Sequence, residues 1–294
     1  VTSGRTQIFD LSLGGEIRFG VTTRIVYAEW WGALGNNSKT DNQTPIQQAI
    51  HALEDSPSTV IGGYVLLSGG IYLCSSYVKL SNRVALKGSN GRDTVLKVNN
   101  ATWDGSRNLV LCRNEATILN ITGITQANPC VVTVSDTSAL IDGYVMRIEN
   151  VGGMTQVNDI DFSIDVLSAT TIRLNAYGTT TGIDSTAYTA YTTGGTITRH
   201  ISQFHVKLED LTVDANDNVD VTRLVYAPSW NEHCGTRRCL IYNYTLSGIK
   251  IDSNYGGTST VGIDQTEFFA SATSTYAAGL DILSSAISNW TNYS

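Results

Sequence analysis

The sequence has few charged residues and few prolines, and it contains no long apolar run. Only 15% of its 294 residues are charged, and 4 are prolines. No apolar stretch approaches the roughly 18 residues that a membrane-spanning helix needs, so membrane insertion is not expected. The net charge is −7, and the longest basic cluster is Arg237-Arg238. Nucleic-acid binding is not expected either, because a surface that follows phosphates needs clustered Lys and Arg.

The sequence also lacks the spacings that mark metal sites. No two of its five cysteines have the two-residue separation of a zinc site, and its four histidines are scattered. We therefore expect no metal site and no cofactor, and we predict that the cysteines are buried, unpaired thiols. The five are Cys74, Cys112, Cys130, Cys234 and Cys239.

Short runs of Val, Ile, Thr and Tyr, separated by Gly, Asn and Asp, dominate the sequence. Stretches rich in Ala, Leu, Glu and Lys are nearly absent. This pattern predicts an all-β protein, with one large domain or two smaller ones. Because the chain does not begin with Met and shows no secretory signal, we expect a fragment or a processed product. Its last residues stop within the strand pattern, so we expect either sequence beyond Ser294 or a partner that covers the exposed strand edges.

One segment predicts a helix, over residues 45–54. Thr44 and Gln47 have the spacing of a capping box, and Pro45 suits the first helical turn. An apolar stripe then follows at helical spacing, which predicts one buried face. The stripe consists of Ile46, Ala49, Ile50 and Leu53.

The strands that follow are short, and toward the end of the chain they recur. One series has a spacing of about 26–29 residues and a second, interleaved series about 25–31, which is typical of two faces of a solenoid. The first series is Leu211-Thr-Val213, Leu240-Ile-Tyr242 and Glu267-Phe-Phe269. The second is Leu224-Val-Tyr226, Ile249-Lys-Ile251 and Leu280-Asp-Ile282.

Residues 121–199 have a different texture, with longer alternating strands, hairpin-like turns and glycine pairs. They predict a small antiparallel barrel inserted between solenoid coils. The expected organisation is an N-terminal segment (1–27), the first coils with the helix (28–120), the inserted barrel (121–199) and further coils (200–294).

Residues 29–33, Glu-Trp-Trp-Gly-Ala, with Thr40-Asp41 and the helix after them, resemble the N-terminal signature of pectate-lyase-like β-helix proteins. Residues 63–73 resemble the first coil of that family, with Ser68-Gly69 where proline-glycine is usual. Residues 208–214 are similar to one of its middle coils. The resemblance implies a right-handed parallel β-helix with a short N-terminal capping helix.

Residues 121–134, 152–158 and 191–197 resemble a small β-module of phage tail proteins, related to the first catalytic-cysteine half-domain of ubiquitin-activating enzymes. The two resemblances together imply a bacteriophage tail fibre or tailspike. The expected partners are two further copies in a homotrimer, other tail or baseplate proteins, and the host surface polysaccharide. The expected location is the virion's tail appendage, outside the cell.

Aromatic rings can lie on sugar faces and charged groups can bind sugar hydroxyls, although core or trimer packing explains aromatic residues equally well. The candidates for glycan binding are Trp230, Tyr242, Tyr255 and Arg237.

A polysaccharide depolymerase, either a hydrolase or a lyase, is the main alternative. Hydrolysis needs two carboxyls about 5–9 Å apart, which neighbouring coils can supply. No pair stands out in the sequence, and the candidates are Glu232, Asp252 and Asp281. A third alternative is a secreted, filament-forming or adhesive β-helix protein without a viral role.

Overall fold

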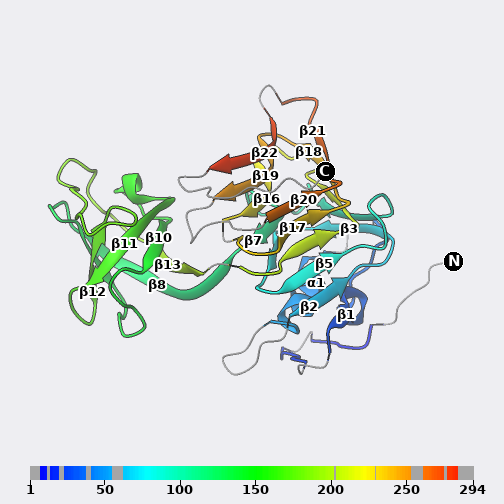
Figure 1. The fold of residues 1–294 in the computed structure, drawn as a ribbon, viewed down its shortest axis with the longest axis horizontal. Helices are drawn as coiled ribbons and strands as arrows, with labels where there is room; N and C mark the ends of the chain where they lie inside the picture. Colours follow the sequence, from blue (N-terminus) through cyan, green and yellow to red (C-terminus); the bar gives the residue numbers. More distant parts are fainter. Residues whose placement is uncertain are drawn as a thin grey trace. The chain divides into compact units, whose positions relative to one another are not determined.

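The chain divides into two compact units, one formed by residues 1–114 and 202–294 and the other by Glu115–Ile201. The computed structural model describes residues 7–11, 14–19, 23–37, 41–54, 62–201, 203–228, 230–252, 261–274 and 277–283. The first unit is called the three-sheet unit and the second the barrel (Figure 1).

Three parallel sheets build the three-sheet unit. Sheet A contains, in spatial order, β1 (Ile25–Tyr27), β2 (Gly63–Leu66), β5 (Val84–Lys87), β14 (Lys207–Glu209), β17 (Cys234–Arg237) and β20 (Val261–Asp264). Sheet B contains β3 (Gly70–Cys74), β6 (Thr94–Val98), β15 (Thr212–Asp214), β18 (Leu240–Tyr244) and β21 (Glu267–Ala270). Sheet C contains β4 (Val78–Leu80), β7 (Val110–Cys112), β16 (Arg223–Ala227), β19 (Ser247–Asp252) and β22 (Ala278–Leu283).

From β2 onward the chain visits sheets A, B and C in turn and then returns to sheet A. Three consecutive strands, one in each sheet, are called a rung. Figure 1 shows β16, β19 and β22, the sheet C strands of three successive rungs, stacked on one another. Both predicted strand series are found here, the first in sheet B and the second in sheet C. In both series the first strand is shifted by one residue from the predicted register. Thr212 rather than Leu211 aligns with Leu240, and Val225 rather than Leu224 aligns with Ile249.

Stacked apolar rows form the core of this unit. Along sheet B, aligned residues of successive rungs point inward, and all but the last are at most 1% exposed. This row is Tyr72, Leu96, Val213, Ile241 and Phe268. A residue in such a row is buried mainly by the equivalent residues of the rungs on either side, so each rung needs its neighbours.

The helix α1 (Gln43–His51) lies with β1 and β2 at one end of the three-sheet unit (Figure 1). All four residues of the predicted stripe are fully buried. The predicted capping box is wrong, because the N-cap residue is Asn42 and its side chain does not cap the helix. The Gln47 amide instead exchanges two hydrogen bonds with the backbone of Lys79, of 2.8 and 3.0 Å, and so fastens the helix to β4.

The second unit is a closed antiparallel barrel, as predicted for this part of the sequence, with strand order β10-β11-β12-β9-β8-β13. Its core includes Met146, Ile148 and Ile164, all fully buried. A charged pair is also buried, since the Arg147 guanidinium lies 3.3 Å from the Asp161 carboxylate. The strands are β8 (Asn114–Ile124), β9 (Val131–Val134), β10 (Val145–Glu149), β11 (Ile160–Val166), β12 (Thr171–Asn175) and β13 (Thr196–Ile201).

Two short 3-10 helices complete the elements, η1 (Ala28–Trp31) in the three-sheet unit and η2 (Thr155–Val157) in the barrel. All five cysteines are free and buried, as predicted, and burial raises the pKa of each thiol. In the described part of the chain, no helix is long and apolar enough to cross a membrane.

Candidate functional site

Side chains alternate between the two faces of a strand, so each sheet of the three-sheet unit carries outward rows as well as inward ones. On sheet B one outward row mixes charged and aromatic residues, which can bind the hydroxyl groups and the faces of sugars. This row is Leu73, Lys97, Asp214, Tyr242 and Phe269.

Asp214 is engaged by its surroundings. Its carboxylate lies 3.1 Å from the Lys97 ammonium and accepts hydrogen bonds from the Asn243 amide (2.8 Å) and the Asn216 backbone N–H (2.7 Å). The residue is only 8% exposed. These contacts link three neighbouring rungs, so the role of this carboxylate is structural.

The rings of Tyr242 and Phe269 form what is called the aromatic ledge. Their centroids are 4.5 Å apart and their planes are inclined by 30°. Phe269 is 39% exposed. A partly exposed pair of rings on neighbouring strands offers an apolar surface of the kind that packs against a sugar ring.

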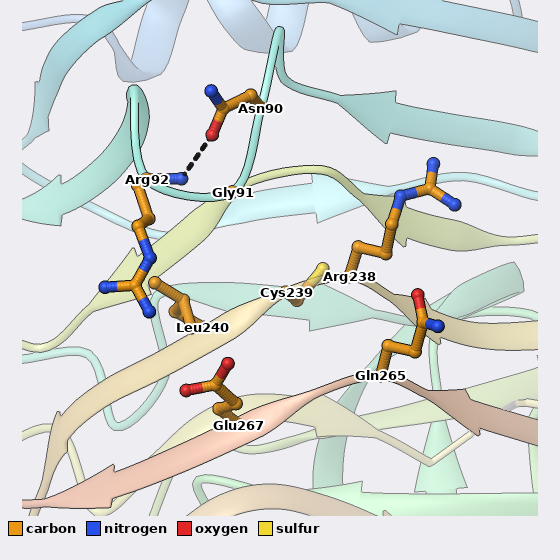
Figure 2. A pocket seen from close by; sticks show the side chains of 8 residues that line it. All are labelled: Asn90, Gly91, Arg92, Arg238, Cys239, Leu240, Gln265 and Glu267. Atoms are coloured by element: carbon orange, nitrogen blue, oxygen red, sulfur yellow. Dashed lines mark hydrogen bonds between the residues drawn. The ribbon is translucent and has the colours of Figure 1, made fainter. Parts of the chain in front are cut away.

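A depression of about 310 Å³ lies beside the ledge, lined by residues of three rungs. Leu240 and Glu267 belong to its lining, and each precedes a ledge residue by two positions on the same strand. The depression and the ledge therefore share the outer face of sheet B. Figure 2 shows the lining, which consists of Asn90, Gly91, Arg92, Arg238, Cys239, Leu240, Gln265 and Glu267.

One wall of the depression is the loop between β5 and β6. This loop extends over β15, since the Thr212 hydroxyl donates a hydrogen bond to the carbonyl oxygen of Gly91. It reaches the next rung at Arg238, where a Cβ atom added to Gly91 would lie 2.9 Å from the carbonyl oxygen. Glycine is therefore required at position 91, because any side chain would push the loop away from that rung.

Arg238, which also lines the depression, is held in place by an ion pair. Its guanidinium donates two hydrogen bonds, of 2.5 and 2.8 Å, to the Asp210 carboxylate. The Lys87 ammonium lies 3.2 Å from the same carboxylate. These contacts, with Arg238 contributing most, hold the pKa of Asp210 below its ordinary value, and the hydrogen bonds to Asp210 raise the pKa of Arg238.

Sheet A carries a row of alternating charge on its outer face. Lys87, Glu209, Arg237 and Asp264 are aligned on successive strands. The Lys87 ammonium lies 3.5 Å from Glu209, and the Arg237 guanidinium 3.4 Å from Asp264. Opposite charges aligned on neighbouring strands stabilise the observed register. Arg237, a predicted glycan contact, is 55% exposed and belongs to this row.

The other predicted site residues lie in several places. Trp230 is 3% exposed and packs in the core. Glu232 is exposed in the turn before β17 of sheet A. Asp281 lies on sheet C, 3.0 Å from the Lys250 ammonium. Asp252 is on the neighbouring strand, aligned with Leu283.

Tyr255 lies outside the described residues. Of the four predicted glycan contacts, only Tyr242 is found on the sheet B face that carries the ledge and the depression. Within the described ranges, no group of three or more His, Cys, Asp or Glu residues is placed to hold a metal ion.

Sequence reasoning missed Phe269, Glu267 and Arg92 as site residues. The predicted repeat aligned Tyr242 with Phe269 and contained the signal for the ledge. Nothing comparable pointed to Arg92, because the sequence of the six-residue loop between β5 and β6 gives no indication of how far this loop extends over the neighbouring rungs.

No family model and no curated protein matches the sequence. Among solved structures, the tailspike gp61 of Pseudomonas phage phi297 is 12% identical with a TM-score of 0.35, over 84% of this chain and 49% of that one. The A-module of the Azotobacter vinelandii mannuronan C-5 epimerase AlgE4 is 14% identical with a TM-score of 0.35, over 87% and 53%.

The Gp54 tailspike of Acinetobacter baumannii bacteriophage AP22, in complex with a capsular saccharide, is 12% identical with a TM-score of 0.32, over 74% and 37%. This chain thus spans about half or less of the length of these proteins. Likenesses of this size do not define its function.

Proposed function

We propose that the chain is the right-handed parallel β-helix part of a phage tail fibre or tailspike, a homotrimer in the virion's tail appendage that binds a host surface polysaccharide. The resemblance of residues 29–33 and 63–73 to pectate-lyase-like proteins supports the β-helix, as do three parallel sheets visited in turn. The resemblance of residues 121–134 to a phage tail module supports the viral role and, with it, attachment to other tail or baseplate proteins.

One observation carries the binding role, namely the aromatic ledge of Tyr242 and Phe269 beside a depression on the outer face of sheet B. Partly exposed rings cost free energy in water, and a sugar ring packed on them would remove apolar surface from solvent. The polar lining beside them supplies donors and acceptors for sugar hydroxyls. Arg237, exposed on sheet A, is a second candidate contact.

Binding without cleavage is proposed ahead of depolymerisation. Asp281 is paired with Lys250 and accepts a hydrogen bond from the Ser247 hydroxyl, so its contacts join neighbouring strands of sheet C and indicate a structural role. Glu232 lies in the turn before β17 of sheet A, whereas Asp252 and Asp281 lie on neighbouring strands of sheet C. These three residues are the candidates for a catalytic role should the chain prove to be a hydrolase or a lyase.

The test measures binding of the purified chain to an array of bacterial capsular and O-antigen polysaccharides. Tyr242→Ala should weaken binding about tenfold or more, since it removes half of the ledge. Tyr64→Ala is the matched control, because Tyr64 is 37% exposed on the outer face of sheet A. Equal loss in both variants, or no binding to any polysaccharide, would contradict the proposed site.

Two further readouts separate the alternatives. Light scattering should give the mass of a trimer, whereas open-ended filaments would favour the non-viral adhesive protein. Release of reducing ends or unsaturated sugars from a bound polysaccharide would favour the depolymerase.

A further inference from the structure

The depression beside the aromatic ledge presents two charges of opposite sign that do not pair with each other. Arg92 and Glu267 both line it and both are exposed. Among the described residues, no oppositely charged group lies within 4.0 Å of the Arg92 guanidinium or the Glu267 carboxylate. Figure 2 shows the two side chains to either side of Leu240 in this view.

The neighbouring arginine is in a different state. The Arg238 guanidinium donates two hydrogen bonds to the Asp210 carboxylate, which neutralises its charge. Asp210 itself does not line the depression. Of the two guanidinium groups in the lining, that of Arg92 is therefore the one without a carboxylate partner. A guanidinium fork matches a carboxylate in a bidentate arrangement, and such charge-assisted hydrogen bonds are about twice as strong as neutral ones.

The backbone that carries Arg92 is held on both sides. Its own N–H donates to the Asn90 side-chain oxygen at 2.8 Å, and the Asn90 amide donates to Asp93 at 2.6 Å. The preceding carbonyl, of Gly91, accepts from the Thr212 hydroxyl. The position from which the Arg92 side chain extends is thus fixed before any ligand arrives, which lowers the entropy cost of binding.

We infer that this depression binds an acidic sugar residue of the polysaccharide, with the sugar's carboxylate on Arg92. Leu240 offers an apolar floor for one face of the sugar, and the Glu267 carboxylate and the Gln265 amide bind its hydroxyl groups. A volume of about 310 Å³ suits one small ring at this position, with the chain continuing over the ledge. The inference rests on the proposed function and names the class of polysaccharide.

A neutral sugar fits this arrangement less well. It would cover the Arg92 guanidinium without offering it a charged partner, and desolvating an unpaired charge is unfavourable. Glu267 adds a second condition, because it repels a carboxylate placed on its side of the depression. The pair therefore selects an acidic sugar in one orientation.

The experiment compares each polysaccharide that binds with the same polymer after chemical reduction of its carboxyl groups. Polysaccharides that bind should contain a sugar acid, and their reduction should weaken binding about tenfold or more. Arg92→Gln should lose a similar factor toward the native polymer and nothing further toward the reduced one. Arg107→Gln is the matched control, since it removes the same charge from an exposed residue before β7.

The salt dependence gives a second readout. Binding of the unaltered chain to the native polymer should weaken as salt rises from 0.05 to about 0.5 M, because salt screens the ion pair with Arg92, and Arg92→Gln should flatten this dependence.

The outcomes separate this inference from the proposed function. Strong binding to neutral or carboxyl-reduced polymers, with loss in Tyr242→Ala but none in Arg92→Gln, would overturn the acidic-sugar inference and leave the ledge in place. The absence of binding to every polysaccharide would overturn the proposed function and this inference together. Equal loss in Arg92→Gln and Arg107→Gln would reduce the effect to net charge and overturn the inference.

Discussion

The two units of this chain place their charged residues differently. In the three-sheet unit, ion pairs such as Arg237 with Asp264 lie on outer faces and the rungs enclose apolar rows. In the barrel, Arg147 and Asp161 are both buried, with side chains 7% and 4% exposed. The barrel is closed, whereas each parallel sheet of the three-sheet unit has a first and a last strand in the order observed.

The difference concerns what fixes the pairing of strands. Closure and antiparallel pairing determine the register of the barrel, and its buried ion pair forms only in the register that aligns Arg147 with Asp161. Stacked rungs have no closure, so their register depends on rows that repeat from strand to strand, apolar inside and charged outside. The four variant sets below test this contrast.

The largest effect is expected when Arg147 is replaced by alanine. The Asp161 carboxylate, 3.3 Å away, would then be buried without this partner, which costs about 3–5 kcal/mol. Calorimetry should show a lower transition for the barrel. Arg237→Ala breaks a pair whose side chains are 55% and 50% exposed, and it should cost at most about 1 kcal/mol. Equal costs would remove the contrast between the units.

Core truncations should separate the two units. Leu208→Ala and Ile148→Ala each empty space at a fully buried position, at a cost of about 2–5 kcal/mol. All five tryptophans of the sequence lie outside residues 115–201, so tryptophan fluorescence reports on the three-sheet unit alone. In urea, Leu208→Ala should shift the fluorescence transition and Ile148→Ala should not. A shift in both would mean that the units unfold together.

Close backbone stacking should give a smaller effect. Gly235 has a φ of +149°, and a Cβ atom there would lie 1.9 Å from the carbonyl oxygen of Gly262. Gly235→Ala should therefore destabilise the three-sheet unit by about 1–3 kcal/mol, measured as the urea midpoint. Gly262→Ala, in the same row, has nothing within 4 Å of the added atom and should be close to neutral. The opposite ranking would show that the rungs separate easily.

The smallest effect is a pH dependence of the three-sheet unit. The rings of His205 and His233 stack with centroids 4.8 Å apart. Burial first, and then His233, Lys207 and Arg83, lower the pKa of His205, with Glu232 acting in the opposite direction.

Because its charged form is disfavoured by folding, the unfolded chain binds the proton more readily. Stability is then fully present above the ordinary histidine pKa of about 6.5 and declines as the pH falls through that value toward the lower folded pKa. The fluorescence-detected urea midpoint should drop between pH 7.5 and 5.5. His205→Gln should reduce this drop, and His233→Gln should reduce it in part. An unchanged drop in both variants would assign the pH dependence to other groups.

Much of the fold was predictable from the sequence because apolar residues repeat. The two predicted strand series are found in sheets B and C. Sheet A was missed as a third series, because β14, β17 and β20 read Lys-Leu-Glu, Cys-Gly-Thr-Arg and Val-Gly-Ile-Asp. Strands of this kind carry one or two inward apolar residues, too few to give a period.

Local rules failed where a side chain had a distant partner. Thr44 and Gln47 have the spacing of a capping box, but Gln47 bonds to the backbone of Lys79, 32 residues away. Trp230 shows the same limit, since an aromatic residue in a β-rich sequence can be in the core or on the surface. The repeat in the sequence aligned Tyr242 with Phe269. It therefore indicated the aromatic ledge but not the depression beside it.

The loop that carries Gly91 reaches past its immediate neighbour to the second rung along. In a stack where layers touch only adjacent layers, opening can spread one layer at a time from an end. This loop joins three layers, so the middle one cannot open by itself without releasing the loop. Hydrogen exchange of the backbone amides in β15 should consequently be slow. A ligand that enters the depression would contact a loop that is already held in place.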